Sequence, residues 1–212
     1  MVKYVNELIE RYPILKDNKK EILDAYALME KGFAKNGKLL IAGNGGSAAD
    51  AEHIAGELMK SFKKPRQIPE KLAQRLKKVD KSYGRILSKN IEMGLLTIPL
   101  ITDNALATAY TNDVTGECVF AQKLCGYGKK GDVFLAISTS GNSRNVVLAA
   151  VMAKALGMKV IGLTGASGGK LKKFSDVCIC VPETETYKVQ ELHLPIYHCI
   201  CLMLEDRFFG ER

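Results

Sequence analysis

Short apolar runs alternate with longer amphipathic stretches along most of the chain. Each run is rich in branched and leucine residues, as buried strands are, and each is followed by a segment with helical features. Strands that alternate with helices predict a parallel sheet covered on both faces. We therefore expect an α/β fold: a doubly wound, flavodoxin-like sheet of five parallel strands sandwiched by helices. The predicted strands are residues 38–43, 96–102, 131–138, 159–165 and 176–182, and the segments that follow them are residues 50–61, 103–113, 139–157, 166–174 and 186–208.

Two further regions lie outside this alternation. Residues 1–35 predict a pair of N-terminal helices that is broken near residues 11–18, and the second helix carries an apolar stripe. Residues 62–94 interrupt the repeat as a basic insertion, and the prolines at its start mark a turn rather than a domain linker. We therefore expect a single domain over residues 1–212.

The composition is that of a soluble globular protein. A chain of 212 residues with 47% hydrophobic content is long enough for one sizeable core. No apolar run approaches the roughly 18 to 20 residues that span a bilayer, and the N-terminal residues carry charges where a signal peptide has its apolar centre. We expect a cytoplasmic protein without a membrane partner. The six cysteines lack CxxC spacing and lie mostly in apolar stretches, which predicts reduced core thiols rather than disulfides or a zinc ribbon.

The positive charge is concentrated in one segment. The net charge is +8, and eleven of the Lys and Arg residues lie between Lys60 and Lys89, beside only two acidic residues. Nucleic acid is therefore not an expected partner of the chain. Leu72, Leu76 and Val79 recur there at helical spacing, which favours a short amphipathic helix with a solvated basic face. The alternative is a polyanion site or a wall that attracts phosphate.

A cluster of hydroxyl side chains follows the third predicted strand. Ser138, Thr139, Ser140 and Ser143 lie at a strand-to-helix turn, where hydroxyls and free N-terminal amides can surround an anion such as phosphate. The turn is neither a Walker loop, since no Gly-Lys-Ser/Thr follows, nor a dinucleotide fingerprint, since GxGxxG is absent. The alternative is that these residues only cap a helix.

The segment GNGGS at residues 43–47 predicts a second wall for the same ligand. Its glycines permit close approach of the backbone, and Ser47 can cap the helix that follows. On that helix, His53 and Glu57 are four residues apart and share one face. They are either part of a site or an ordinary surface pair.

The last predicted helix carries the other candidate side chains. Gln190 and His198 are eight residues apart and can share a face, whereas His193 points elsewhere and is interpreted as structural or interfacial. Pro195 within this helix removes one backbone hydrogen bond and suggests a kink.

Five motifs in register resemble the sugar isomerase (SIS) domain family, and specifically its phosphoheptose isomerase branch. They are GNGGSAADAEHIAGEL, TND at 111–113, AISTSGNSRNV, LTGASGGKL and KVQELHLPIYH, and together they extend over nearly the whole chain. The resemblance implies a homotetramer that converts sedoheptulose 7-phosphate into glycero-manno-heptose 7-phosphate. It implies no organic cofactor.

The resemblance also assigns roles to individual residues. It implies acid/base catalysis by Glu57 and His198. It implies a zinc site formed by His53, Glu57, Gln190 and His198. It implies a substrate site whose phosphate and sugar contacts are Asn44, Gly45, Gly46, Ser47, Asn112, Asp113, Ser138, Thr139, Ser140, Ser143 and Gln190.

The chain departs from the pattern of the branch at three places. Lys60, Ser61 and Phe62 stand where the heptose enzymes commonly have Gly-Arg-Tyr or Gly-Arg-Phe, TDN at 102–104 is closer to a regulatory branch, and the basic insertion is longer than expected. Two alternatives to the heptose reaction remain. One is a tetrameric, non-catalytic scaffold that resembles replication-initiator-associating proteins, although that branch lacks the carboxylate and the last histidine. The other is an isomerase of another phosphosugar, such as the arabinose 5-phosphate type.

Overall fold

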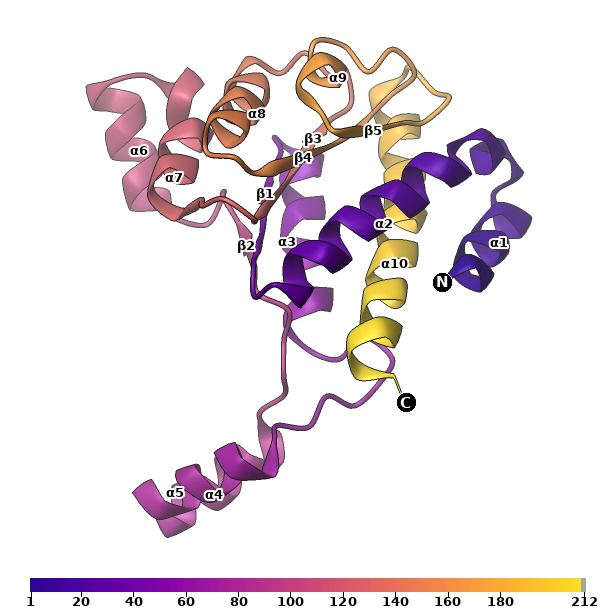
Figure 1. Cartoon of the computed structure of the whole chain (residues 1–212). Helices are drawn as coiled ribbons and strands as arrows, with labels where there is room; N and C mark the ends of the chain where they lie inside the picture. Colours follow the sequence, from indigo (N-terminus) through magenta and orange to yellow (C-terminus); the bar gives the residue numbers. More distant parts are fainter. Residues whose placement is uncertain (211–212) are drawn as a thin grey trace.

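Five parallel strands form one sheet in the order β2-β1-β3-β4-β5, which confirms the predicted flavodoxin-like arrangement (Figure 1). The computed structural model describes residues 1–210, so the last two residues of the predicted domain lie outside the described residues. Because the chain winds in opposite directions from β1 and β3, their carboxyl ends bound a crevice, the usual ligand position in such sheets. The strands are β1 (Leu39–Ala42), β2 (Thr97–Pro99), β3 (Val133–Ser138), β4 (Lys159–Thr164) and β5 (Val177–Cys180).

Helices cover both faces of the sheet, as Figure 1 shows. Strand side chains alternate between the faces, so β1 directs Leu39 and Ile41 into one core and Leu40 and Ala42 into the other. One face carries α1 (Val2–Arg11), α2 (Lys19–Ala34), α3 (Gly46–Met59) and α10 (Thr186–Phe209). The other carries α7 (Val119–Tyr127), α8 (Arg144–Ala155) and α9 (Leu171–Phe174), with α6 (Asn104–Asp113) beside α7.

The N-terminal helix pair forms where it was predicted. A 3₁₀ turn at Pro13–Asn18 separates α1 from α2, because a proline lacks a backbone donor and favours the start of a new helix. The apolar stripe of α2 includes Ile22, which is fully buried in the core. Asn18 ties the turn to the sheet by donating from Nδ2 to the carbonyl of Cys180 at 2.9 Å.

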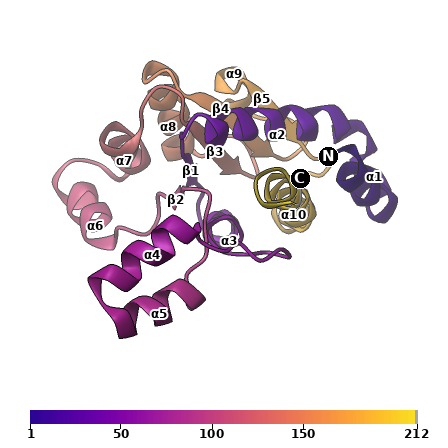
Figure 2. The ribbon, with the colours of Figure 1, turned by 60° about the horizontal axis from the view of Figure 1, so that its bottom comes forward.

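The basic insertion folds as a hairpin of two helices, α4 (Glu70–Val79) and α5 (Lys81–Asn90), which projects away from the sheet (Figures 1 and 2). The predicted short helix is confirmed as α4, whereas the second helix, α5, was not predicted. Asp80 ends α4 and accepts a hydrogen bond from the amide of Tyr83 at 2.7 Å, so it starts a second helix. The predicted apolar stripe is not buried within the chain, since Leu72 and Val79 are 38% and 88% exposed.

Other boundaries differ from the expected ones for local reasons. Helix α3 begins at Gly46 rather than at residue 50, so it follows the glycine turn directly. Strand β2 is only three residues long and ends at Pro99, which cannot donate to a neighbouring strand. Helix α7 was not predicted. Within residues 1–210, no helix combines the length and the hydropathy needed to cross a membrane.

Candidate active site

The hydroxyl cluster lies at the turn between β3 and α8, at the carboxyl end of the sheet. Ser138 is buried, and its Oγ donates to Oγ of Ser143 at 3.0 Å. Ser140 Oγ accepts from the amide of Asn142 at 3.1 Å. Ser143 occupies the N-cap position of α8 but makes no side-chain capping bond. Ser143 therefore does not cap α8 through its side chain, and its own amide donates to Oγ of Ser138 at 3.5 Å within the cluster.

The glycine turn after β1 forms the second wall of this space. Gly45 has a φ of +55°, which favours glycine, and Gly46 is the first residue of α3. The side-chain amides of Asn44 and Asn145 exchange two hydrogen bonds of 2.9 Å each and join the two turns. Asn145 was not among the predicted residues, although it follows directly in the same motif. Ser47 is buried at the start of α3.

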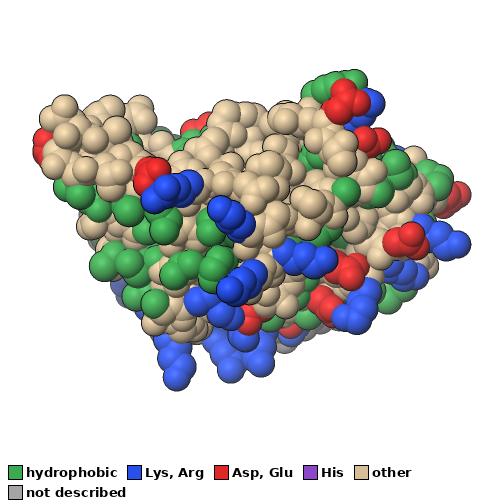
Figure 3. Space-filling model, turned by 90° about the horizontal axis from the view of Figure 1, so that it is seen from above, with side chains coloured by type: hydrophobic (Ala, Val, Ile, Leu, Met, Phe, Trp, Pro, Cys, Tyr) green, Lys and Arg blue, Asp and Glu red, His purple; other side chains and the backbone are tan. Residues whose placement is uncertain are grey.

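A third loop, residues 165–170, packs against the hydroxyl cluster. The amide of Gly165 donates to the carbonyl of Thr139, and the amide of Leu171 donates to the carbonyl of Gly141, both at 2.9 Å. Figure 3 views this end of the molecule, where uncharged polar groups and backbone predominate and Lys and Arg side chains lie along one edge. The three loops together form the candidate phosphate site.

Two histidines and a carboxylate meet between α3 and α10, nearer the C-terminal end of α3 than the glycine turn. Nε2 of His53 lies 3.3 Å from Oε1 of Glu57 and 3.4 Å from Nε2 of His198. The first pair is set by the helical spacing on α3, whereas the second joins residues that are far apart in the sequence. Glu57 is 14% exposed and His53 is 42% exposed, so the cluster is reachable from solvent.

Tyr197 and Asp50 support this cluster from behind. The hydroxyl of Tyr197 is 3.0 Å from Nδ1 of His53 and donates to Oδ1 of Asp50 at 3.2 Å. Burial raises the pKa of Asp50 and the pKa of Tyr197. These contacts orient the imidazole of His53 so that Nε2 faces Glu57 and His198. Neither residue was predicted, because a tyrosine in an apolar helix looks like an ordinary core residue.

The environment favours a neutral His198. Burial lowers the pKa of His198 and the nearby His53 lowers it further, while Glu57 opposes both. Lys60, the first of the three residues that depart from the pattern of the heptose enzymes, lies with Nζ 3.4 Å from Oε2 of Glu57. Its side chain is 61% exposed, so this is a solvated contact.

A buried ion pair fixes the end of α3 against α10. Arg66 and Glu205 are about 1% exposed, with Nη2 of Arg66 2.9 Å from Oε1 of Glu205. Arg66 also donates to the carbonyls of Glu57 at 2.9 Å and Leu58 at 2.7 Å. Although burial alone would raise it, the pKa of Glu205 is lowered by the amides of the residues that begin the insertion and by Arg66. Nothing in the sequence distinguishes Arg66, because it lies in a strongly basic segment.

Comparison with known proteins identifies the family. The family model described as SIS domain matches residues 2–93 and 87–165. The chain is 38% identical to phosphoheptose isomerase 2 of Campylobacter jejuni, over 98% of this chain and 92% of that protein. It is 40% identical to the phosphoheptose isomerase of Aneurinibacillus thermoaerophilus, over 85% of this chain and 78% of that protein. The chain belongs to the SIS-domain family.

Solved structures extend the similarity to the architecture. The phosphoheptose isomerase of Neisseria gonorrhoeae matches this SIS domain with a TM-score of 0.72 and 31% identity, over 95% of this chain and 96% of that chain. The phosphoheptose isomerase of Francisella tularensis matches it with a TM-score of 0.74 and 28% identity, over 97% and 98% of the two chains.

Two groups of the predicted residues lie apart from the histidine cluster of the SIS domain. Gln190 stands against the start of α3, and its Cδ is 2.9 Å from where a Cβ of Gly46 would lie. This position adjoins the candidate phosphate site. Asn112 and Asp113 are exposed at the end of α6, where Nδ2 of Asn112 donates to Oδ1 of Asp113 at 2.9 Å. Within residues 1–210, no hydrogen bond joins either of these two residues to the other candidate residues.

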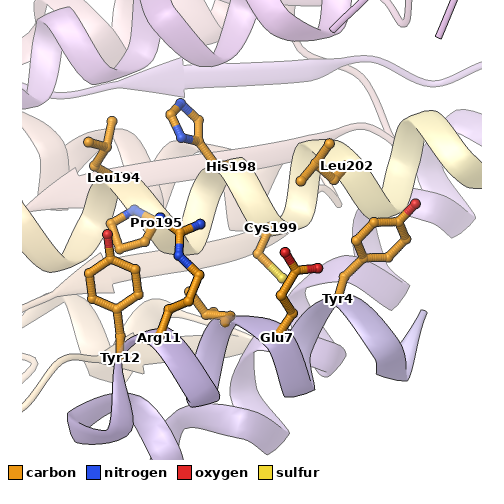
Figure 4. A pocket seen from close by; sticks show the side chains of 10 residues that line it. Tyr4, Glu7, Arg11, Tyr12, Leu194, Pro195, His198, Cys199 and Leu202 are labelled. Carbon is orange, nitrogen blue, oxygen red and sulfur yellow. The ribbon is translucent and has the colours of Figure 1, made fainter. Parts of the chain in front are cut away.

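His198 also forms part of a cleft of about 200 Å³ between α1 and α10 (Figure 4). The α1 side supplies Tyr4, Glu7 and Arg11, with Tyr12 just beyond the helix, and its polar groups face the α10 side chains. His193 is fully buried, as the interpretation of a structural histidine requires. Helix α10 continues through Pro195 without a break in the helical assignment.

Two distances in the histidine cluster have the spacing of zinc ligands. Ligand atoms about 2.0–2.1 Å from a tetrahedral zinc lie about 3.3–3.4 Å from one another. The two measured distances from Nε2 of His53, 3.3 Å to Glu57 and 3.4 Å to His198, have this spacing. Among residues 1–210, however, no group of three or more His, Cys, Asp and Glu side chains converges in a way that could hold a metal ion.

Proposed function

We propose that this SIS-domain protein is an aldose–ketose isomerase of phosphorylated sugars, and that it converts sedoheptulose 7-phosphate into D-glycero-D-manno-heptose 7-phosphate. The observation that carries the proposal is the cluster of Glu57, His53 and His198 between α3 and α10, on the helix that starts at the glycine turn beside the hydroxyl cluster. The similarity to phosphoheptose isomerases over nearly the whole chain supports the same activity.

A carboxylate and a neutral imidazole suffice for the chemistry. Moving a carbonyl between C1 and C2 requires one group that carries a proton between the two carbons through an enediol, and another that exchanges protons between the oxygens. We assign the first role to Glu57 and the second to His198. The lowered pKa of His198 keeps its imidazole neutral near pH 7, so that it can accept a proton.

The spacing along α3 favours a long sugar. Glu57 lies about 16 Å along the helix axis from Gly46 at its start, and helical side chains lean back toward that start. A ligand with its phosphate at the glycine turn must therefore extend well down the helix to bring its carbonyl to Glu57. A heptose phosphate, with the phosphate at the end opposite the carbonyl, has this extended form.

The substrate contacts follow from the same arrangement. We assign the phosphate to the three loops and the sugar hydroxyls to side chains around them. Gln190 fits a substrate contact through its position against Gly46. Asn112 and Asp113 complete the proposed set only if the substrate or a neighbouring subunit reaches α6. The proposed substrate contacts are Asn44, Gly45, Gly46, Ser47, Asn112, Asp113, Ser138, Thr139, Ser140, Ser143 and Gln190.

We propose zinc as the cofactor, with His53, Glu57 and His198 as candidate ligands that must move closer together to bind it. Gln190, the fourth ligand that the resemblance implies, stands against Gly46 and must also move toward the cluster. The spacing of the ligand atoms around His53 supports this choice. Zinc bound there would polarise the substrate carbonyl and stabilise the contact between α3 and α10. The proton transfers remain with the side chains.

Zinc content tests the metal assignment without reference to activity. Protein incubated with zinc chloride, desalted and analysed by elemental mass spectrometry is expected to retain about one zinc per chain. His53→Ala is expected to lose it, whereas Glu52→Gln, an exposed position on the same helix, is expected to retain it. Parent protein without zinc after this treatment would contradict the assignment.

We also propose a cytoplasmic homotetramer in which neighbouring subunits complete the site. The cleft between α1 and α10, which opens beside His198, supports a shared site. The non-catalytic scaffold is the rival assignment, and the presence of both Glu57 and His198 argues against it. Incubation of the pure protein with a panel of ketose phosphates, with and without a chelator, separates the two. Turnover supports an isomerase, the preferred substrate identifies the sugar, and no turnover of any member supports the scaffold.

A further inference from the structure

Two cysteines on strand β5 form a thiol pair behind the candidate phosphate site. Cys178 and Cys180 are two residues apart on the edge strand of the sheet, so their side chains share one face. Their sulfurs are 3.6 Å apart. Both side chains are partly accessible and no disulfide joins them. The proposed isomerase chemistry uses neither thiol.

The surroundings leave room for both sulfurs. A Cβ on Gly162 would lie 2.9 Å from Sγ of Cys178, and a Cβ on Gly168 would lie 3.1 Å from Sγ of Cys180. Thr164 completes the lining, with its hydroxyl donating to Sγ of Cys180 at 3.5 Å. The absence of side chains at the two glycines creates the space in which the thiols meet.

The geometry favours a bridging atom over a direct disulfide. Residues two apart on a strand have Cα atoms about 6.6 Å apart, which is near the upper end of the roughly 4.4–6.8 Å that disulfides span. A soft atom about 2.3 Å from each of two sulfurs, at the angle of about 100° of a pyramidal trivalent centre, holds them about 3.5 Å apart. The measured 3.6 Å matches the bridged arrangement with little movement of β5.

The same tripeptide, Cys-Ile-Cys, occurs a second time, on helix α10. Cys199 and Cys201 are buried, and residues two apart on a helix point in widely different directions. Burial raises the pKa of both thiols. On β5 the two thiols differ: the hydrogen bond from Cys178 and that from Thr164 lower the pKa of Cys180 against the effect of burial, whereas the hydrogen bond with Cys180 and burial raise the pKa of Cys178. The molecule thus contains a matched pair of motifs that differ in geometry.

We propose that Cys178 and Cys180 form a chelating dithiol site for a soft, thiophilic electrophile of the trivalent arsenical class. The reaction forms two arsenic–sulfur bonds. The oxygen of R–As=O leaves as water with the two thiol protons, and arsenic stays trivalent. The electrophile brings its own third substituent, so the site needs no further protein ligand.

Occupancy of this site is linked to the phosphate loops through Gly168. Gly168 is packed on Cys180, and its carbonyl touches Gly141 of the β3–α8 turn. Gly169 is packed on Ser140, since a Cβ there would lie 2.5 Å from the carbonyl of Ser140. A bulky group on the sulfurs therefore displaces residues 168–169 and disturbs the hydroxyl cluster. This consequence rests on the proposed phosphate site, whereas the dithiol site itself does not.

The test uses phenylarsine oxide as the probe on reduced protein carrying Cys118→Ser and Cys125→Ser, which removes the other two partly accessible or exposed thiols. Intact mass spectrometry is expected to give one arsenical per chain with the loss of two titratable thiols. The adduct should survive excess monothiol and be removed by 2,3-dimercaptopropanol. In this background, Cys178→Ser and Cys180→Ser should each abolish the retained adduct.

Three results would overturn the dithiol site: no adduct, an adduct that persists in either serine variant, or an adduct that peptide mapping assigns to Cys199 and Cys201. The link to the phosphate loops is measured by calorimetric titration with inorganic phosphate before and after the probe. A several-fold weaker affinity is expected after it, and an unchanged affinity contradicts the link. If phosphate does not bind before the probe is added, the phosphate site is wrong, while the adduct alone still decides the thiol site.

Discussion

The α3–α10 junction and the α4–α5 hairpin, which follows α3 in the chain, use charge in opposite ways. The junction contains one buried ion pair, Arg66 with Glu205, and a small cluster around Glu57. The hairpin carries many exposed basic side chains and projects from the sheet (Figure 2). A buried charge has few alternative partners and fixes its neighbours, whereas exposed charges are solvated and screened. Local charge density therefore indicates less about function here than burial does.

The largest effect is expected from Glu57→Gln, which removes the proposed proton carrier without changing the shape of the side chain. Loss of a general acid or base typically lowers the rate by about 10² to 10⁴. Steady-state kinetics with sedoheptulose 7-phosphate measure the effect, and His198→Asn should behave similarly. Folding, followed by circular dichroism, should be unchanged. Glu52→Gln on the exposed side of α3 is the control, and a Glu57→Gln enzyme with more than half of the parent activity would refute the assignment.

The next effect tests the ion pair that holds the junction. Arg66→Met leaves Glu205 buried without its partner, which typically costs about 3–5 kcal/mol in unfolding free energy. Denaturant unfolding measures this loss. Arg207→Gln breaks an exposed pair with Glu30 and should cost no more than about 1 kcal/mol. Equal losses of unfolding free energy in the two variants would contradict the idea that the buried pair stabilises the protein more than the surface pair.

A smaller effect is expected at the phosphate loops. Ser138→Ala removes one hydroxyl that can donate to a charged phosphate, and such bonds are worth roughly 1.5 to 3 kcal/mol. The loss should appear in substrate affinity rather than in kcat, and Ser140→Ala should behave similarly. Ser82→Ala on the hairpin is the matched control. If the parent protein binds phosphorylated and unphosphorylated sugars equally well, the anion site is wrong.

The smallest effect is expected from the hairpin. Replacing Lys77, Lys78 and Lys81 by Gln should slow substrate capture several-fold at low salt and have little effect at high salt, since exposed charges are screened beyond about 8 to 10 Å. Stopped-flow measurements at two salt concentrations test this. The control replaces three exposed lysines of the N-terminal helices, Lys16, Lys31 and Lys35. Unchanged kinetics at low salt would show that the hairpin is a solvated surface without a role in substrate capture.

The features that sequence predicted are those with a local signal. The apolar runs identified all five strands, and the sheet order followed from their alternation with helices. The hydroxyl cluster and the glycine turn were found because each is contiguous in sequence. The pairing of His53 with Glu57 followed from helical spacing. Helices α5 and α7 were missed, although Asp80 is an N-cap signal for α5; α7 has no side-chain cap.

The supporting contacts could not be found in this way because they join distant segments. Arg66 and Glu205 are 139 positions apart, and Arg66 lies among residues that are mostly solvated. Tyr197 on α10 donates to Asp50 on α3, and the two residues are 147 positions apart in the sequence. The approach of His198 to His53 was expected only from the resemblance to the family. Long-range partners of polar residues leave no periodic pattern in a single sequence.

The closed base of the insertion makes this position suitable for grafting. Gln67 and Glu92 form an antiparallel bridge, the amide of Met93 donates to the carbonyl of Arg66 at 2.7 Å, and the amide of Leu95 returns to the carbonyl of Leu58 at 2.9 Å. The chain thus leaves and rejoins the domain at neighbouring points. We therefore expect that a reporter peptide or a binding module can replace residues 68–91 in an engineered enzyme while the α3–α10 junction keeps its shape.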